Sequence, residues 1–148
     1  MDDKNEANNY TISTDKTLLQ IDVIHDYLSR HSYWAAGIPL QTVKRSVDNS
    51  LTFGVYHQQK QVGYARVITD HATFAYLADV FILPEHRGKG ISKSLMKNIM
   101  NYPELQGLRR WLLATRDAHS LYAQFGWTPL AKPDRLMELH NPDVYKST

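Results

Sequence analysis

The chain has no cysteine, no long hydrophobic run and little net charge of either sign. Without cysteine it has no disulfide, no thiolate metal site and no cysteine nucleophile. The longest apolar runs are too short for a membrane-spanning helix, and the polar, acidic start MDDKNEANNY is unlike a signal peptide. A formal net charge of +2 is far from the concentrated positive field of a dedicated nucleic-acid binder. These absences predict a cytoplasmic protein with neither a nucleic-acid nor a membrane partner.

The composition that remains is that of one ordinary domain, with 148 residues, 43% of them hydrophobic and 22% charged. We expect one domain over residues 1–148, with residues 1–9 loosely ordered. Hydrophobic periodicity and turn residues predict the elements in chain order. They are a strand at 10–13, helices at 17–28 and 40–47, a hairpin of LTFGVYH and QVGYARVIT around QQKQ, a strand at 73–83 buried on both faces, a helix from 91, a strand at 110–114, a helix at 118–125 and a last strand at 135–140.

The stretch LPEHRGKGIS lies between the apolar strand and the amphipathic helix that follows it. A helix start offers unpaired backbone N–H groups, and glycines let an anion approach them closely. Arg87, Lys89 and Lys93 add positive charge around the same point. The stretch matches neither a P-loop nor a dinucleotide fingerprint, which needs a third glycine where Lys93 stands. From these residues alone, a phosphate seat and a solvated basic helix start are equally good interpretations.

The wider context resembles the GNAT superfamily of N-acetyltransferases. Its signature is matched by the run from Arg87 to Ser92, preceded by ADVFILPEH, and its later segment is matched by WLLATRDAHSLYAQFGW. Two separated motifs in the expected order are more specific than either one alone. The resemblance implies a single α/β domain with a mixed, mostly antiparallel central sheet and helices on both faces. It also implies acetyl-CoA as the co-substrate.

In the family, the glycine-rich turn binds the pyrophosphate of acetyl-CoA, and the pantetheine arm pairs with the strand before that turn. Thr115 stands where many members carry an asparagine that contacts this arm, and its hydroxyl is a substitute hydrogen-bonding group. The residues so implied for acetyl-CoA are Val80, Phe81, Ile82, Arg87, Gly88, Lys89, Gly90, Ile91, Ser92, Lys93 and Thr115.

The resemblance implies Tyr122 as the general acid that protonates the departing CoA thiolate. Periodicity alone favours a core role, because Ala118, Leu121, Tyr122 and Phe125 form a helical stripe. Asp79 is a candidate general base or a partner for an ammonium group of the substrate. The alternative interpretation is an acid that is only solvated or salt-bridged. Water is the alternative base.

The acceptor pocket of the family is formed largely by the connection between the first two helices, here SRHSYWAAGIP. Tyr33 and Trp34 either cover an amine substrate there or plug the loop onto the core. Arg66 on the hairpin either reaches a substrate carboxylate or lies on the surface.

Three function classes remain open from the sequence. The first is an acetyltransferase for a small-molecule amine, working by direct attack in a ternary complex. The second is a non-catalytic acetyl-CoA-binding or regulatory module, and the third is a nucleic-acid-binding domain, which the small net charge disfavours. The seven histidines show no zinc-site spacing, so no metal is expected. A homodimer is compatible with a family member of this size.

Overall fold

The structure is a computed structural model that describes residues 9–146. The strands are β1 (Tyr10–Ser13), β2 (Leu51–His57), β3 (Lys60–Thr69), β4 (Phe74–Ile82) and β5 (Arg110–Leu113). The helices are α2 (Ile21–His31), α3 (Leu40–Asp48), α4 (Ile91–Met100) and α5 (His119–Ala123). Short 3₁₀ turns are η1 (Lys16–Leu18), η2 (Pro84–His86), η3 (Pro103–Leu105) and η4 (Pro133–Arg135).

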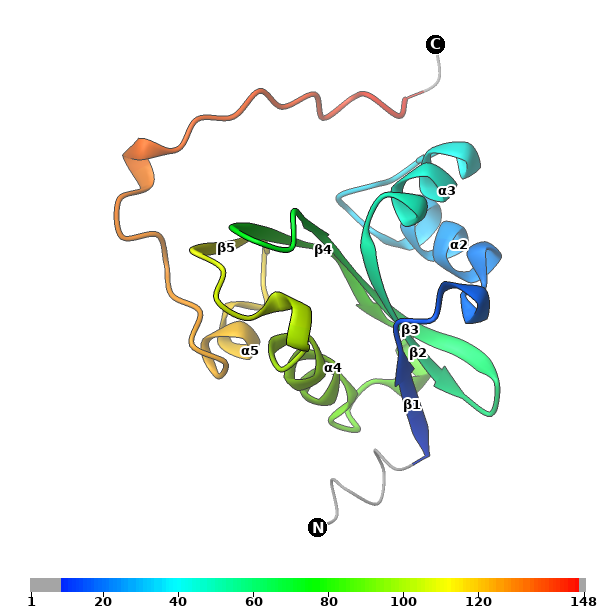
Figure 1. The fold of residues 1–148 in the computed structure, drawn as a ribbon. Helices are drawn as coiled ribbons and strands as arrows, with labels where there is room; N and C mark the ends of the chain where they lie inside the picture. The colour runs from blue at the N-terminus through cyan, green and yellow to red at the C-terminus, as the bar shows by residue number, and fades with distance from the viewer. Residues whose placement is uncertain (1–8, 147–148) are drawn as a thin grey trace.

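The five strands form one sheet in the order β1-β2-β3-β4-β5 (Figure 1). Neighbouring strands are antiparallel except β4 and β5, which are parallel. The sequence expectation of a mixed, mostly antiparallel sheet in an α/β domain is therefore confirmed.

Helices cover both faces of this sheet, as expected (Figure 1). On one face, α4 buries Leu95 and Ile99 against sheet residues that include Phe53. On the other face, α2 and α3 pack around Tyr64 and Phe81. The apolar alternation of the strands divides their side chains between two cores, one on each side of the sheet.

Several element boundaries differ from the sequence prediction. The first helix begins at Ile21 instead of residue 17, because Asp15 accepts the backbone N–H of Thr17 at 2.9 Å and caps the separate turn η1. The hairpin turn is shorter than QQKQ. Gln58 and Gln59 both have positive φ, the backbone of a tight two-residue turn that follows the twist of the strands.

Two strand predictions are wrong. In β4 the buried Ala75 and Leu77 alternate with half-buried residues, so one face is only partly covered. Residues 135–140, predicted as the last strand, pair with no strand among residues 9–146, and all of them are exposed. A strand needs a neighbour to accept and donate its backbone hydrogen bonds, and the sequence pattern does not report whether one is present.

Two further expectations concern the ends of the chain and membranes. The expected loose order of residues 1–9 falls almost wholly outside the described residues. Within residues 9–146, none of the helices combines the length and the apolar character needed to cross a bilayer.

Candidate active site

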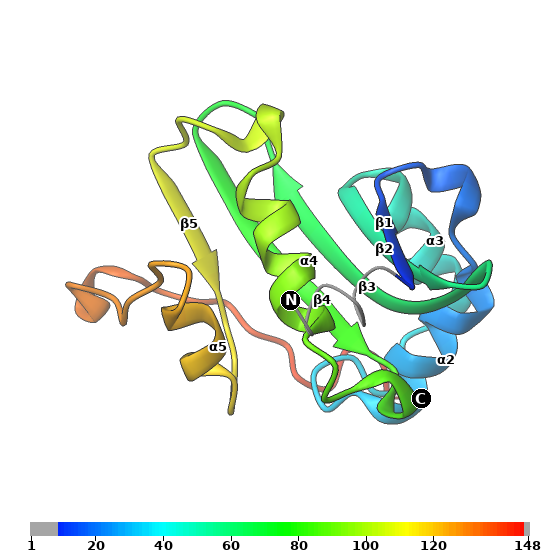
Figure 2. The ribbon, with the colours of Figure 1, turned by 90° about the horizontal axis from the view of Figure 1, so that it is seen from below.

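Strands β4 and β5 separate part of the way along the sheet. They pair from Phe74 opposite Arg110 to Leu77 opposite Leu113. Beyond that point the two strands diverge toward their carboxyl ends (Figure 2), and residues 78–82 have no strand beside them on this side within the described chain. The backbone groups that face this opening are free to bind a ligand that lies along β4 as an added strand would.

A bulge in β4 lies where the opening begins. Between the pairs Tyr64–Phe81 and Arg66–Ala78, β4 contributes one residue more than β3. Asp79 lies in this bulge with a φ of 56°, a left-handed conformation that Asp tolerates better than most side chains. The extra residue bends the strand and directs the Asp79 side chain toward two of the predicted acceptor residues.

Asp79 brings Trp34 and Arg66 together. One carboxylate oxygen accepts the indole N–H of Trp34 at 2.8 Å, and the other accepts Nε of Arg66 at 2.8 Å. The Asp79 side chain is only 8% exposed and that of Arg66 17% exposed, so the ion pair is largely desolvated. Ser50 accepts a second guanidinium N–H of Arg66 at 3.2 Å. Three candidates from different parts of the sequence therefore form one cluster.

Tyr33, next to Trp34 in the loop between α2 and α3, contacts the segment that follows β5. Its hydroxyl accepts the backbone N–H of Arg116 at 3.0 Å, and the Arg116 guanidinium lies 4.0 Å from the centre of its ring. This cation–π contact links the two sides of the opening. Tyr33 and Trp34 are both about half exposed and meet edge to face, with ring centres 5.1 Å apart. They form a wall of the opening and are not packed into either core.

Tyr122 lies on α5 and is almost completely buried. Burial raises the pKa of its phenol above the usual value, and the nearby phenol of Tyr33 acts in the same direction. The hydroxyl of Thr115 accepts the N–H of Ala118 at 3.0 Å, just before α5 begins. Thr115 therefore fixes the start of the helix that carries Tyr122, and its hydroxyl hydrogen is still available for donation.

The glycine-rich turn lies at the start of α4. Gly88 and Gly90 have φ values of 77° and 78°, and no atom lies within 4 Å of the place where a Cβ would stand on either one. Within residues 9–146, the backbone N–H groups of residues 88–93 have no acceptor. Lys89 and Lys93 are exposed beside them. The open space, free N–H groups and positive charge fit a phosphate or pyrophosphate group.

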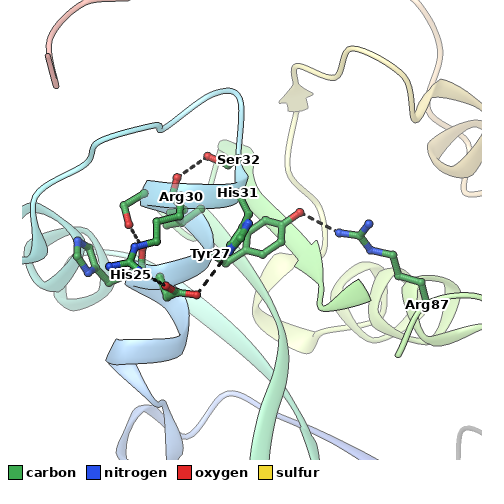
Figure 3. A network of polar contacts seen from close by, with 9 residues as sticks. His25, Tyr27, Arg30, His31, Ser32 and Arg87 are labelled. Atoms are coloured by element: carbon green, nitrogen blue, oxygen red, sulfur yellow. Dashed lines mark hydrogen bonds and ion pairs between the residues drawn. The ribbon is translucent and has the colours of Figure 1, made fainter. Parts of the chain in front are cut away.

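Arg87 has a different environment from the other residues of the turn. Its Nε donates to the carbonyl of Ile82 at 2.8 Å. Its Nη2 donates to the hydroxyl of Tyr27 on α2 at 3.0 Å (Figure 3). Tyr27 in turn stacks on Phe81, with ring centres 4.1 Å apart. Arg87 thus fastens the turn to both β4 and α2, and three of its five N–H donors are left for a ligand.

Sequence reasoning missed two residues of this region. Tyr27 adjoins the apolar stripe of α2, so its burial was predictable, but its bond to Arg87 joins residues 60 apart in the chain. Arg116 follows Thr115 directly and carried no motif of its own. Only the folded chain places its guanidinium over Tyr33.

Comparisons with known proteins agree with this geometry. The profile of the acetyltransferase (GNAT) family matches residues 21–127. The chain is 37% identical over 137 residues to the Gibberella zeae protein named "Putative acetyltransferase FG08082", covering 78% of this chain and 76% of that one.

Solved structures are similar as well. A crystal structure from Xanthomonas campestris pv. campestris, described as a "putative acetyltransferase belonging to the gnat family", superposes with a TM-score of 0.91 at 54% identity, covering 93% of this chain and 97% of that one. Glucosamine-6-phosphate N-acetyltransferase from Arabidopsis thaliana has a TM-score of 0.61 at 13% identity, covering 89% and 97%. That second similarity concerns the fold alone.

Proposed function

The chain belongs to the GNAT family of acetyltransferases, and from this premise we propose that it transfers the acetyl group of acetyl-CoA to the primary amine of a small molecule within a ternary complex. The observation that carries the proposal is the opening beside residues 78–82 of β4. It has the glycine-rich turn at one end, and the Tyr33–Trp34 wall and Tyr122 border it. Both reactants would meet beside this part of β4.

The pyrophosphate of acetyl-CoA binds at the start of α4 in this proposal. The free N–H groups of residues 88–93 donate to its oxygens, with Lys89 and Lys93 adding charge. Gly88 and Gly90 allow the close approach because a side chain there would fill the seat. Arg87 holds the shape of the turn through Ile82 and Tyr27.

The pantetheine arm lies along Val80, Phe81 and Ile82 and uses the backbone groups of this stretch that face the opening, as an added strand would. The Ile82 carbonyl among them already accepts Nε of Arg87. Thr115 faces it from the segment after β5. When bound, acetyl-CoA supplies an acetyl thioester whose carbonyl carbon the amine attacks. A backbone N–H of this part of β4 stabilises the negative charge that develops on the carbonyl oxygen.

The acceptor amine lies against the Tyr33–Trp34 wall. The exposed aromatic face of Trp34 favours a cationic or apolar part of the acceptor. Asp79 keeps Trp34 in place, and both of its oxygens are already hydrogen-bonded. This geometry favours a positioning role for Asp79 and leaves water to accept the amine proton.

Tyr122 supplies the proton that the departing CoA thiolate needs as its carbon–sulfur bond breaks. A raised pKa keeps the phenol protonated at neutral pH, which is the form that a general acid requires.

The experiment that tests this proposal measures thiol release from acetyl-CoA with polyamines, amino acids, amino sugars, aminoglycosides and peptides as acceptors. Turnover with a small amine supports it, and turnover with peptides alone refutes the small-molecule part. Tight acetyl-CoA binding in a thermal-shift assay with no turnover would favour the non-catalytic module. The cytoplasmic location remains a prediction of the sequence.

A further inference from the structure

Arg66, the residue that the sequence suggested for a substrate carboxylate, already has partners inside the protein. Its Nε donates to Asp79 at 2.8 Å and its Nη1 donates to Ser50 at 3.2 Å. Only 17% of its side chain is exposed. Its charge is therefore compensated, and an anionic group on the acceptor would need a different cation.

Arg116, which follows β5, is a cation beside the same aromatic wall and has no anionic partner. Its guanidinium lies 4.0 Å from the ring centre of Tyr33, and its backbone N–H donates to the Tyr33 hydroxyl at 3.0 Å. Within the described part of the chain, its side chain forms no ion pair and donates no hydrogen bond. Because the residue is exposed, all five guanidinium N–H donors are available to a ligand.

Tyr33 holds Arg116 at two points and so fixes the guanidinium more firmly than water fixes an ordinary surface arginine. A side chain that is already held loses less conformational freedom when it binds a ligand. A guanidinium stacked on an aromatic ring also keeps its edge free, and the N–H groups point out of that edge. Two parallel N–H groups match two oxygens of a carboxylate or a phosphate. The stacked Arg116 therefore presents a preformed site for an oxyanion.

Arg116 lies close to the proposed reaction centre. Tyr33 meets Trp34 edge to face, with ring centres 5.1 Å apart. Burial is the main cause of the raised pKa of Tyr122, and the phenol of Tyr33 is close enough to add to it. The pantetheine arm is uncharged, and the pyrophosphate binds at the start of α4 in the proposed complex. An anion beside Arg116 would therefore belong to the acceptor.

We propose that Arg116 binds an oxyanion of the acceptor, a carboxylate or a phosphate, so that the substrate is a small amine carrying such a group, as amino acids and amino-sugar phosphates do. This proposal rests on the proposed acetyl transfer to a small amine and adds the second functional group of that amine. The amine lies against Trp34 and the oxyanion lies on the free edge of Arg116. Arg116 selects and orients the acceptor and takes no part in proton transfer.

The first test compares acceptors that differ only in the oxyanion. Thiol release from acetyl-CoA gives kcat/KM for the common amino acids against their methyl esters, and for glucosamine 6-phosphate against glucosamine. We expect the charged member of at least one pair to exceed its neutral partner by about 10- to 100-fold. The two kinds of pair distinguish a carboxylate from a phosphate. Equal kcat/KM within every pair refutes the proposal and leaves acetyl transfer to a small amine intact.

The second test removes the guanidinium. Arg116→Gln should lower kcat/KM for the charged acceptor about 10- to 100-fold, mainly through KM, and should leave the neutral partner and the KM for acetyl-CoA unchanged. Arg116→Lys keeps the charge without the planar fork and should lie between the two. The control Arg109→Gln removes an exposed arginine just before β5 begins and should change nothing. Equal losses for both members of a pair, or a raised KM for acetyl-CoA, refute the proposal.

The third test separates this proposal from the proposed reaction, because it needs no turnover. The same pairs are titrated calorimetrically into the wild type and into Arg116→Gln, each saturated with CoA. We expect the charged member to bind at least tenfold more tightly to the wild type and the preference to disappear in the variant. A wild type that binds no charged member more tightly than its neutral partner refutes the role of Arg116. Absence of turnover with every amine, together with a clear binding preference, would refute only the acetyl transfer.

Discussion

The indole N–H of Trp34 donates to the carboxylate of Asp79 at 2.8 Å, although the two residues lie 45 positions apart in the chain. The bond fixes the loop between α2 and α3 to the bulge of β4. Arg66 occupies the second oxygen of the same carboxylate and compensates its charge. An acid bound in this way orients an aromatic wall, and it has no free oxygen directed at a substrate.

Replacing Asp79 by asparagine separates positioning from proton transfer. Asparagine tolerates the same positive φ but lacks the charge that holds Arg66. We expect the KM for the amine to rise about tenfold, equivalent to about 1.4 kcal/mol. The free energy of unfolding should fall by about 1–2 kcal/mol, because one charge-assisted bond is weakened. Steady-state kinetics and denaturant unfolding measure these changes.

A general base at this position would behave differently, with kcat reduced by about 10²-fold or more. The matched control is Asp26→Asn on α2, where the carboxylate pairs with Arg30 but is mostly exposed. It should leave both kinetic constants unchanged. A large loss of kcat in Asp79→Asn but not in Asp26→Asn would indicate that Asp79 is the general base.

Trp34→Ala removes the aromatic wall itself. Because the side chain is 42% exposed, its loss should cost less stability than the roughly 3–5 kcal/mol of a truncated core tryptophan. We expect the KM for the amine to rise about tenfold or more while the KM for acetyl-CoA stays the same. Trp34→Phe keeps a ring but loses the bond to Asp79, so its KM for the amine should lie between those of the wild type and of Trp34→Ala. A variant that fails to fold would show that Trp34 only plugs the loop.

Much of this arrangement was readable from the sequence. The order of the elements from β1 to α5 followed from periodicity and turn residues. The two motifs drew attention to the turn and to Tyr122, whose roles stay predictions. The joining of Trp34, Arg66 and Asp79 was not readable, because it depends on a bulge whose extra residue shifts the register of β4.

Residues 135–140 show a second limit. Their apolar residues suit a strand, but a sequence pattern states only that a segment suits a sheet. Whether a neighbouring strand exists is a property of the assembled molecule.

Gly90→Ala tests the pyrophosphate seat. A Cβ at Gly90 would stand in open space at the start of α4, where the phosphate oxygens must come close. We expect the Kd for acetyl-CoA to rise at least tenfold by calorimetry, because both the approach and the backbone shape are disturbed. Gly107→Ala is the matched control, since Gly107 also has a φ of 77° and no atom within 4 Å of its Cβ position. Both variants should lose about 1 kcal/mol of stability. Equal weakening of binding in both would argue against the seat.

Tyr122→Phe removes one hydroxyl and keeps the ring that packs between the core and Trp127. If the phenol protonates the leaving thiolate, kcat should fall about 10²-fold while the Kd for acetyl-CoA stays unchanged. Tyr102→Phe makes the same chemical change at a half-buried tyrosine after α4 and should leave kcat unaltered. Parallel loss of kcat and acetyl-CoA affinity in Tyr122→Phe would indicate a packing role.

The pH dependence of the kcat loss in Tyr122→Phe is a further, independent measurement. Burial raises the pKa of Tyr122 above its usual value near 10, so the phenol stays protonated across the neutral and mildly alkaline range. A general acid works in its protonated form and stops working only as the pH rises through that raised pKa. The ratio of wild-type to Tyr122→Phe kcat should therefore be constant from about pH 7 to pH 9 and should decline only above about pH 10. A ratio that already falls between pH 7 and pH 9 would mean that the phenol loses its proton well below the raised pKa, and proton donation to the thiolate would have to come from another group.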